Sequence, residues 1–221
     1  MIVRIPDVLS TDEVGQLQDV LTVAEFVDGK LTAGWYAKQV KHNQQLPGKV
    51  AKDIREQISS ALQRHPLFQA VVRPKRIHSI LVSRYGEGMS YGRHADNALM
   101  GSGGSQWRSD VSFTIFLNSP DQYDGGELVM EEVDDERAYR LEAGSAIAYP
   151  SSTLHRVDPV TKGIRLVAVG WVQSWVRDPA NREILFELDT VRRSLFAQHG
   201  KTNEFDLLSK NISNLLRQWA E

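Results

Sequence analysis

The chain of 221 residues contains no cysteine. This absence excludes disulfide bonds and thiolate ligands, so a bound metal ion would have to be held by nitrogen and oxygen atoms. The chain also lacks any apolar run near the roughly 20 residues that a membrane helix needs. The first residues, Met1 to Pro6, do not have the pattern of a signal peptide. We therefore expect a cytoplasmic protein without a membrane segment.

The chain carries little net charge, with 26 basic and 28 acidic residues and a formal charge of −2. A balance of this kind gives no global attraction to nucleic acid. The one short basic cluster, Arg73 to Arg76, is interpreted as a solvated turn. A hydrophobic content of 41% with 24% charged residues is typical of a globular protein, and the length fits one domain with an elaboration.

Four segments have helical patterns. Ser10 to Glu13 matches a capping box and predicts a helix with an apolar stripe, and a second helix is predicted over residues 48–64. The apolar positions are Val14, Leu17 and Leu21 in the first helix and Val50, Ile54, Ile58 and Leu62 in the second. Between these helices, Asp28-Gly29 indicates a hairpin turn. Two further helices are predicted over 179–198 and 204–219, the last with Leu208, Ile212, Leu215 and Trp219 on one face.

The middle of the chain has the pattern of short strands separated by turns. The predicted strands are 77–85, 111–118, 127–132, 138–141, 145–149 and 164–171. Many short strands at this spacing favour a sandwich or jelly roll over a parallel α/β sheet. The segment Gly101 to Ser105 is rich in glycine and serine and is interpreted as flexible. It could form a lid or a surface connection.

Three residues in the strand-rich region form a candidate metal site. His94 and Asp96 are two positions apart, so in an extended strand both side chains point to one face. His155 follows 61 residues after His94, far enough for intervening strands to return it beside the first pair. Two imidazoles and one carboxylate, with the remaining positions open, are the ligand set of non-haem Fe(II) oxygenases.

Arg165 is the second informative residue, because it lies within the apolar run Gly163 to Gly170. A guanidinium in a buried strand requires an anionic partner, since an unpaired buried charge is costly. A structural role, in which Arg165 pairs with an internal carboxylate, is the alternative. Outside these positions, His42, His65, His78 and His199 have no comparable context and are interpreted as ordinary histidines.

Several motifs occur together and in order along the chain. They are Tyr85 to Asp96, Phe113 to Asn118, Gly125 to Leu128, His155 and Arg165, preceded by Thr32 to Ala37 and Val40 to Gln44 and followed by the helical tail. In this set the sequence resembles the prolyl-4-hydroxylase branch of the iron and 2-oxoglutarate dependent dioxygenases, and within it the bacterial PKHD-type hydroxylases. The resemblance extends nearly end to end, and its ordered motifs are more specific than any one alone.

The resemblance implies an α+β fold with a mainly β core. This core would be a double-stranded β-helix of jelly-roll, cupin-like type, with N-terminal supporting helices and a C-terminal helical elaboration. The expected division is an N-terminal supporting segment over 1–75, the dioxygenase core over 76–176 and a C-terminal helical subdomain over 177–221.

The resemblance also implies roles for single residues. His94, Asp96 and His155 would be the Fe(II) ligands, and Arg165 would receive the distal carboxylate of the co-substrate 2-oxoglutarate. Tyr85 occupies the position of the family tyrosine that contacts the same co-substrate, and Thr114 is placed with it as a cofactor-binding candidate. One alternating set of side chains between 111 and 117 should line the pocket. Phe116 and Val167 stand where some relatives have tyrosine and serine.

The function implied is hydroxylation of a small molecule or peptidyl group with O₂, releasing succinate and CO₂. L-Ascorbate is a further candidate cofactor. Oxidative demethylation of nucleic acid is an alternative that the charge does not favour, and a non-catalytic, cupin-like metal-binding sensor is another. Self-association through the C-terminal helices is plausible. Candidate substrate contacts are Trp35, Tyr36, Asn43, Gln44, Arg93 and Asn97.

Overall fold

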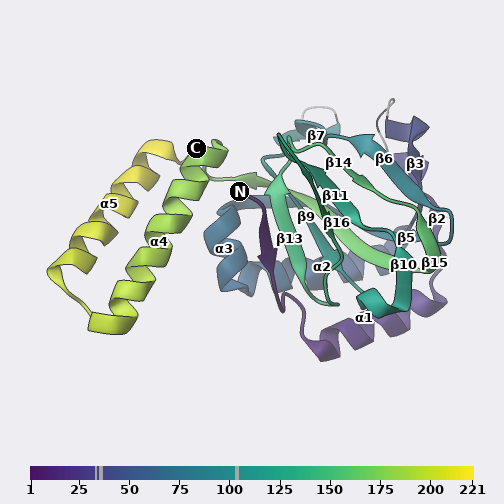
Figure 1. Cartoon of the computed structure of the whole chain (residues 1–221), viewed down its shortest axis with the longest axis horizontal. Coiled ribbons are helices and arrows are strands. Elements are labelled where there is room, and N and C mark those ends of the chain that lie inside the picture. Colours follow the sequence, from purple (N-terminus) through teal and green to yellow (C-terminus); the bar gives the residue numbers. More distant parts are fainter. Residues whose placement is uncertain (33, 35–36, 103–104) are drawn as a thin grey trace.

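Two antiparallel sheets face each other in the computed structural model, which describes residues 1–32, 34, 37–102 and 105–221 (Figure 1). The larger sheet has seven strands, in the order β1 (Val3–Ile5), β13 (Ala146–Pro150), β9 (Val111–Phe116), β16 (Arg165–Ser174), β5 (Pro74–Tyr85), β4 (Gln44–Gln45) and β2 (Val27–Asp28). The smaller sheet has five, in the order β12 (Glu136–Tyr139), β11 (Leu128–Glu131), β14 (His155–Val157), β6 (Ser90–His94) and β3 (Lys41–His42). This pair of sheets confirms the predicted jelly-roll core.

Two short strand pairs complete the β structure, β10 (Tyr123–Gly125) with β15 (Val160–Gly163) and β7 (Leu99–Ser102) with β8 (Ser105–Arg108). The supporting helices are α1 (Thr11–Val23), α2 (Gly48–Arg64) and α3 (Pro66–Val72), with 3-10 turns at Gly29–Thr32, Ala37–Gln39 and Pro120–Gln122. The tail forms a helical hairpin of α4 (Pro179–His199) and α5 (Asn203–Trp219) that projects to one side of the sheets. None of the helices in the described residues combines the length and the apolar composition of a membrane span.

The first helix forms for the reasons the sequence indicated, and the second does so in part. At α1, the Ser10 hydroxyl accepts from the Glu13 amide at 3.2 Å, while the Glu13 carboxylate accepts from the Ser10 amide at 2.9 Å. Its apolar stripe is buried as predicted. In α2 the prediction for Val50 is wrong, since this side chain is 42% exposed and Ala51 takes the inward position.

Two local predictions are corrected by the structure, and a third falls partly on residues that the structure does not describe. Asp28-Gly29 is no hairpin turn, because β2 ends at Asp28, and the Asp28 carboxylate accepts from the Lys30 amide at the start of a 3-10 turn. Arg73 to Arg76 is no solvated turn, because β5 begins at Pro74 and the Arg73 guanidinium donates to the Leu185 carbonyl. Gly101 to Ser105 includes the ends of two paired strands, β7 and β8, while Gly103 and Gly104 lie outside the described residues.

Three apolar clusters stabilise these layers. The largest packs the outer face of the seven-stranded sheet against α1, α2 and α3 and includes Ile58, Phe68 and Phe113. A second fills the space between the sheets, with Phe116 and Met130 fully buried. The third lies within the C-terminal hairpin. The second cluster therefore joins the two sheets that carry the candidate site.

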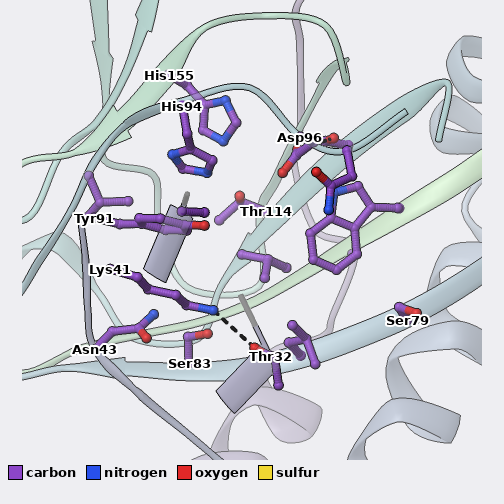
Figure 2. A pocket seen from close by; sticks show the side chains of 18 of the residues that line it. Thr32, Lys41, Asn43, Ser79, Ser83, Tyr91, His94, Asp96, Thr114 and His155 are labelled. Atoms are coloured by element: carbon purple, nitrogen blue, oxygen red, sulfur yellow. Dashed lines mark hydrogen bonds between the residues drawn. The ribbon is translucent and has the colours of Figure 1, made fainter. Parts of the chain in front are cut away.

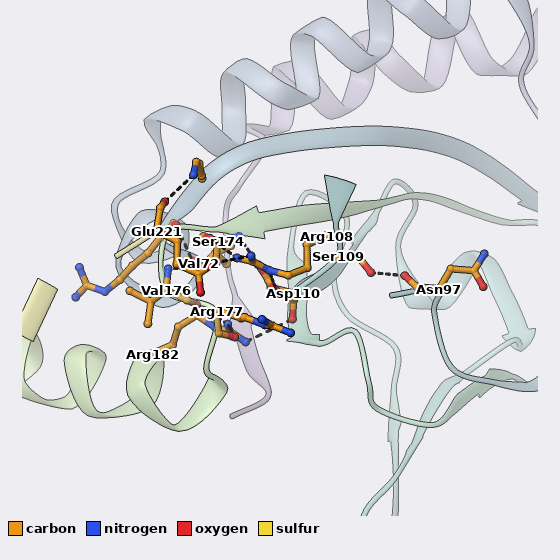
Figure 3. Close-up of polar contacts among 12 residues, drawn as sticks. Val72, Asn97, Arg108, Ser109, Asp110, Ser174, Val176, Arg177, Arg182 and Glu221 are labelled. Atoms are coloured by element: carbon orange, nitrogen blue, oxygen red, sulfur yellow. Dashed lines mark hydrogen bonds and ion pairs between the residues drawn. The ribbon is translucent and has the colours of Figure 1, made fainter. Parts of the chain in front are cut away.

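The C-terminal hairpin is joined to the sheet by a polar network (Figure 3). The Asp110 carboxylate accepts from Arg108 Nε at 2.7 Å and from the Ser174 amide at 2.9 Å, and Arg108 Nη1 donates to the Glu221 carboxylate at 2.6 Å. The buried Arg182 donates to the carbonyls of Val176 and Arg177, both at 2.8 Å. Glu221, the last residue described, is thereby connected through Arg108 to the end of β8, which precedes β9.

Candidate metal centre

The register of the smaller sheet brings the two candidate histidines together. β14 pairs antiparallel with β6, and His155 is the direct partner of His94. Their ring centroids are 4.3 Å apart. β6 ends at His94, so Asp96 lies just beyond the strand and not within it. Even so, one ligand atom from each of the three residues lies within 4.8 Å of the others (Figure 2).

Backbone carbonyls orient both imidazoles. His94 Nδ1 lies 2.8 Å from the Gly92 carbonyl oxygen, and His155 Nδ1 lies 2.9 Å from the Thr153 carbonyl oxygen. Only a protonated nitrogen can donate to a carbonyl, so Nε2 of each ring is left available to bind a metal ion. Burial, and then the nearby His155, lower the pKa of His94 to about 4. His94 is therefore neutral near pH 7, as a metal ligand must be.

Ser112 on β9 positions the Asp96 carboxylate. Its hydroxyl donates to Asp96 Oδ2 at 2.6 Å and lies 2.8 Å from the Ser151 hydroxyl. Ser112 is 2% exposed, so this hydrogen bond is protected from water. Partners of this kind fix the orientation of a ligand and raise metal affinity.

We expect Ser112→Ala to weaken Fe(II) binding by about 10-fold, because the carboxylate loses its fixed orientation. Anaerobic titration of the metal-free protein with Fe(II) measures the change. Ser151→Ala is the matched control, since it leaves the Ser112 to Asp96 hydrogen bond in place. Equal affinities for the two variants would contradict the role of Ser112.

The register of the larger sheet places Arg165 opposite Tyr85. The guanidinium is 1% exposed and lies 5.0 Å from the Tyr85 ring centroid and 5.6 Å from that of Phe116. Its Nε and Nη1 have no hydrogen-bond partner among the described residues. Gly126 covers the side chain at φ 67°, where a Cβ would lie 3.0 Å from Arg165 Cδ. Two buried N–H donors without a hydrogen-bond partner indicate a binding site for an anion.

A cavity of about 520 Å³ connects these groups. Its lining includes the three candidate ligands together with Arg165, Tyr85 and Thr114. Ser112 and Thr114 line it while Phe116 lies in the cluster between the sheets, so this alternating set of β9 faces inward, as expected for one of the two sets. The cavity lies in the size range of pockets for small organic ligands.

Of the predicted substrate contacts, Asn43 and Asn97 line the cavity. Gln44 and Arg93 do not: Gln44 accepts from Arg84 at 2.9 Å, and Arg93 pairs with Glu131 at 2.6 Å. Trp35 and Tyr36 lie outside the described residues.

Tyr149 and Lys41 are among the cavity residues that the sequence reasoning missed. Tyr149 is buried, and its hydroxyl lies 3.4 Å from His155 Nε2. Burial, and then the charge of Asp96, raise the pKa of Tyr149 well above its ordinary value. Lys41 on β3 also lines the cavity. Neither residue had a usable local signal, because both faces of β13 are buried and β3 has only two residues.

The donor set suits a ferrous ion. Two neutral imidazole nitrogens and one carboxylate oxygen, in a cysteine-free chain, match the facial arrangement of non-haem iron sites and leave further positions open. The unpaired guanidinium in the same cavity suits a dicarboxylate co-substrate. The residues present therefore fit both groups, and fold and site together define an iron and 2-oxoglutarate dependent oxygenase.

The comparisons with known proteins agree with this class. Residues 80–173 match the family described as the 2OG-Fe(II) oxygenase superfamily, and residues 180–221 match the PKHD-type hydroxylase C-terminal domain. A PKHD-type hydroxylase of Acaryochloris marina is 62% identical, and one of Picosynechococcus is 61% identical, each over 100% of both chains. The chain belongs to the PKHD-type hydroxylase family.

Among solved structures, a Pseudomonas putida prolyl-4-hydroxylase has a TM-score of 0.54 at 21% identity and covers 78% of this chain and 92% of its own. A Trichoplax adhaerens prolyl hydroxylase, solved with a hypoxia inducible factor peptide, has a TM-score of 0.58 at 15% identity and covers 83% and 86%. At these identities the likeness shows the fold alone, a 2-oxoglutarate oxygenase core. The family supports a hydroxylase over the demethylase and sensor alternatives.

Proposed function

We propose that His94, Asp96 and His155 hold Fe(II), and that Arg165, with Tyr85 and Thr114, binds 2-oxoglutarate in the adjoining part of the cavity. The observation that carries this proposal is the Arg165 side chain, which is buried, unpaired at two nitrogens and part of the same cavity as the triad. A structural ion pair for Arg165 is not supported, because no described carboxylate lies within 4.0 Å of it.

The residues around the centre bind, orient and exclude water. Iron with 2-oxoglutarate supplies the oxidation, in which O₂ converts the co-substrate to succinate and CO₂ and hydroxylates a C–H bond. Arg165 would hold the distal carboxylate by charge-assisted hydrogen bonds, between the Tyr85 and Phe116 rings. Thr114 and Tyr149 would bring hydroxyls close to the ligands, since Thr114 lines the cavity and Tyr149 lies beside His155.

The test of this function uses the unaltered protein. Anaerobic addition of Fe(II) and 2-oxoglutarate to the metal-free chain should produce a visible charge-transfer band, and neither component alone should do so. Admission of O₂ should then yield succinate slowly, even without the primary substrate. A chain that binds Fe(II) but develops no band on addition of 2-oxoglutarate would refute the proposal.

Four finer features complete the proposal. The primary substrate is a small molecule or a peptidyl group, L-ascorbate keeps the iron reduced, and the protein acts in the cytoplasm.

Self-association through the C-terminal hairpin is supported by exposed apolar side chains on α4 and α5, Val191, Phe196 and Leu207. Sedimentation equilibrium of the chain, with and without residues 177–221, would test the last feature.

A further inference from the structure

Lys41 carries a charge in a place where ammonium groups are seldom found. Its side chain lies on β3 and the residue is 5% exposed. Among the described residues its Nζ makes one hydrogen bond, to the Thr32 hydroxyl at 3.1 Å, and no ion pair within 4.0 Å. The Tyr91 ring centroid lies 5.3 Å from the same nitrogen. An ammonium has three N–H donors, so two of them remain for a ligand.

The side chain reaches into the cavity of the candidate metal centre. Figure 2 shows it extending across the space below the His94 and His155 rings, toward Thr32. Lys41 comes from the smaller sheet, whereas Arg165 comes from the larger one. The two cations therefore belong to different walls of one cavity. A single dicarboxylate already bound to the metal and to Arg165 has no third anionic group for Lys41.

A count of the charges with Fe(II) and 2-oxoglutarate bound also leaves Lys41 without an anionic partner. The charges of Fe(II) and Arg165 would be balanced by Asp96 and the two carboxylates of 2-oxoglutarate. Lys41 would then remain as an uncompensated buried charge, which is unfavourable. The acids that act on it are Asp28, which is exposed, and Asp96, which belongs to the triad. Burial lowers the pKa of Lys41 to about 8, so it remains mainly protonated near pH 7.

We propose that Lys41 binds a carboxylate of the primary substrate, which assigns the substrate to the organic acids. The inference rests on the proposed function. The single negative charge of a carboxylate would balance the single positive charge of Lys41. A phosphate group would bring more negative charge than Lys41 can balance. The neutral polar side chains of Asn43, Gln45 and Ser83 also line the cavity, the last two from the larger sheet, and are suited to the uncharged polar groups of the same molecule.

The variants that test this are Lys41→Met, which keeps the length and removes the charge, and Lys41→Arg, which keeps a charge. Lys38→Met is the matched control, because Lys38 is an exposed lysine three residues away. The metal-free Lys41→Met protein should melt within a few degrees of the unaltered chain, since its ammonium lacks an anion there. A much lower melting temperature, with Lys41→Arg restoring it in the absence of any acid, would assign Lys41 a purely structural role and overturn the proposal.

The second readout is the charge-transfer band of the anaerobic complex with Fe(II) and 2-oxoglutarate. Lys41→Met should form it with an affinity for 2-oxoglutarate within about twofold of the unaltered chain. If the unaltered chain forms no band, the proposed function itself fails. If only Lys41→Met loses the band, Lys41 binds the co-substrate and the present inference fails.

The probes are L-amino acids and tripeptides with a free C-terminal carboxylate, each beside its carboxamide. We expect at least one acid to perturb the charge-transfer band where its carboxamide does not. Lys41→Met should lower the affinity of the protein for that acid by about 10- to 100-fold. Lys41→Arg should retain part of the affinity and Lys38→Met all of it. A free amino acid that binds would indicate a small-molecule substrate, and a tripeptide alone would indicate a peptide. Failure of every acid to bind better than its amide overturns the proposal.

Discussion

Alanine in place of His155 is expected to abolish formation of the Fe(II) and 2-oxoglutarate complex. His155 would supply one of three ligands. The other two, His94 and Asp96, lie two residues apart in one chain segment and would not enclose the ion by themselves. The loss of Fe(II) affinity should exceed 100-fold, since changes to the partners of ligands alone cost about 10- to 100-fold. Anaerobic titration with Fe(II), followed by addition of 2-oxoglutarate, measures both losses.

A control for this experiment must separate loss of the ligand from loss of the fold. His155 is 5% exposed, so alanine also leaves a cavity beside Tyr149. His155→Gln fills most of that space and should fold well, yet it should still bind Fe(II) poorly. His199→Ala removes an exposed histidine on α4 and should bind like the unaltered chain. Normal Fe(II) binding by a folded His155→Gln protein would argue against the triad.

The sequence predicted most of what brings the triad and Arg165 into one cavity. Alternating short strands indicated a jelly roll, and a return of 61 residues was enough for His155 to meet His94. The partner of Arg165 was less visible, because its position opposite Tyr85 depends on the register between two distant strands. Buried charge in an apolar run was nevertheless sufficient to single out Arg165 for an anion.

Other features could not be read from local patterns for physical reasons. The burial of Lys41 comes from pairing β3 with β6, where Lys41 lies opposite Tyr91, and two residues are too few to show alternation. Both faces of β13 are buried, so no periodicity indicated that Tyr149 would approach the metal ligands. The glycine and serine content around β7 and β8 resembled a linker, and it did not reveal that these two strands pair with each other.

Replacement of Arg165 by methionine is expected to have a large effect on co-substrate binding and an unusual effect on stability. Loss of the buried guanidinium should lower the affinity for 2-oxoglutarate by about 100-fold or more, equivalent to about 3 kcal/mol, because the distal carboxylate would be buried without a partner. Fe(II) affinity should change little, since Arg165 is not part of the triad. Arg165→Lys should fall between, because an ammonium cannot form a two-pronged contact with a carboxylate.

The stability of the ligand-free protein distinguishes an anion site from a structural arginine. Arg165 is buried with two unpaired nitrogens, so Arg165→Met should unfold at the same urea concentration or a higher one. Arg182→Met is the matched control, because Arg182 is also buried but its guanidinium donates to the Val176 and Arg177 carbonyls. Its loss should destabilise the fold by about 1–3 kcal/mol. In addition, 2-oxoglutarate with Fe(II) should stabilise the Arg182→Met protein against unfolding more than Fe(II) alone does. The Arg165→Met protein should gain no such extra stability from 2-oxoglutarate. A strongly destabilised Arg165→Met protein with normal 2-oxoglutarate affinity would mean that Arg165 holds the two sheets together and that another group seats the co-substrate.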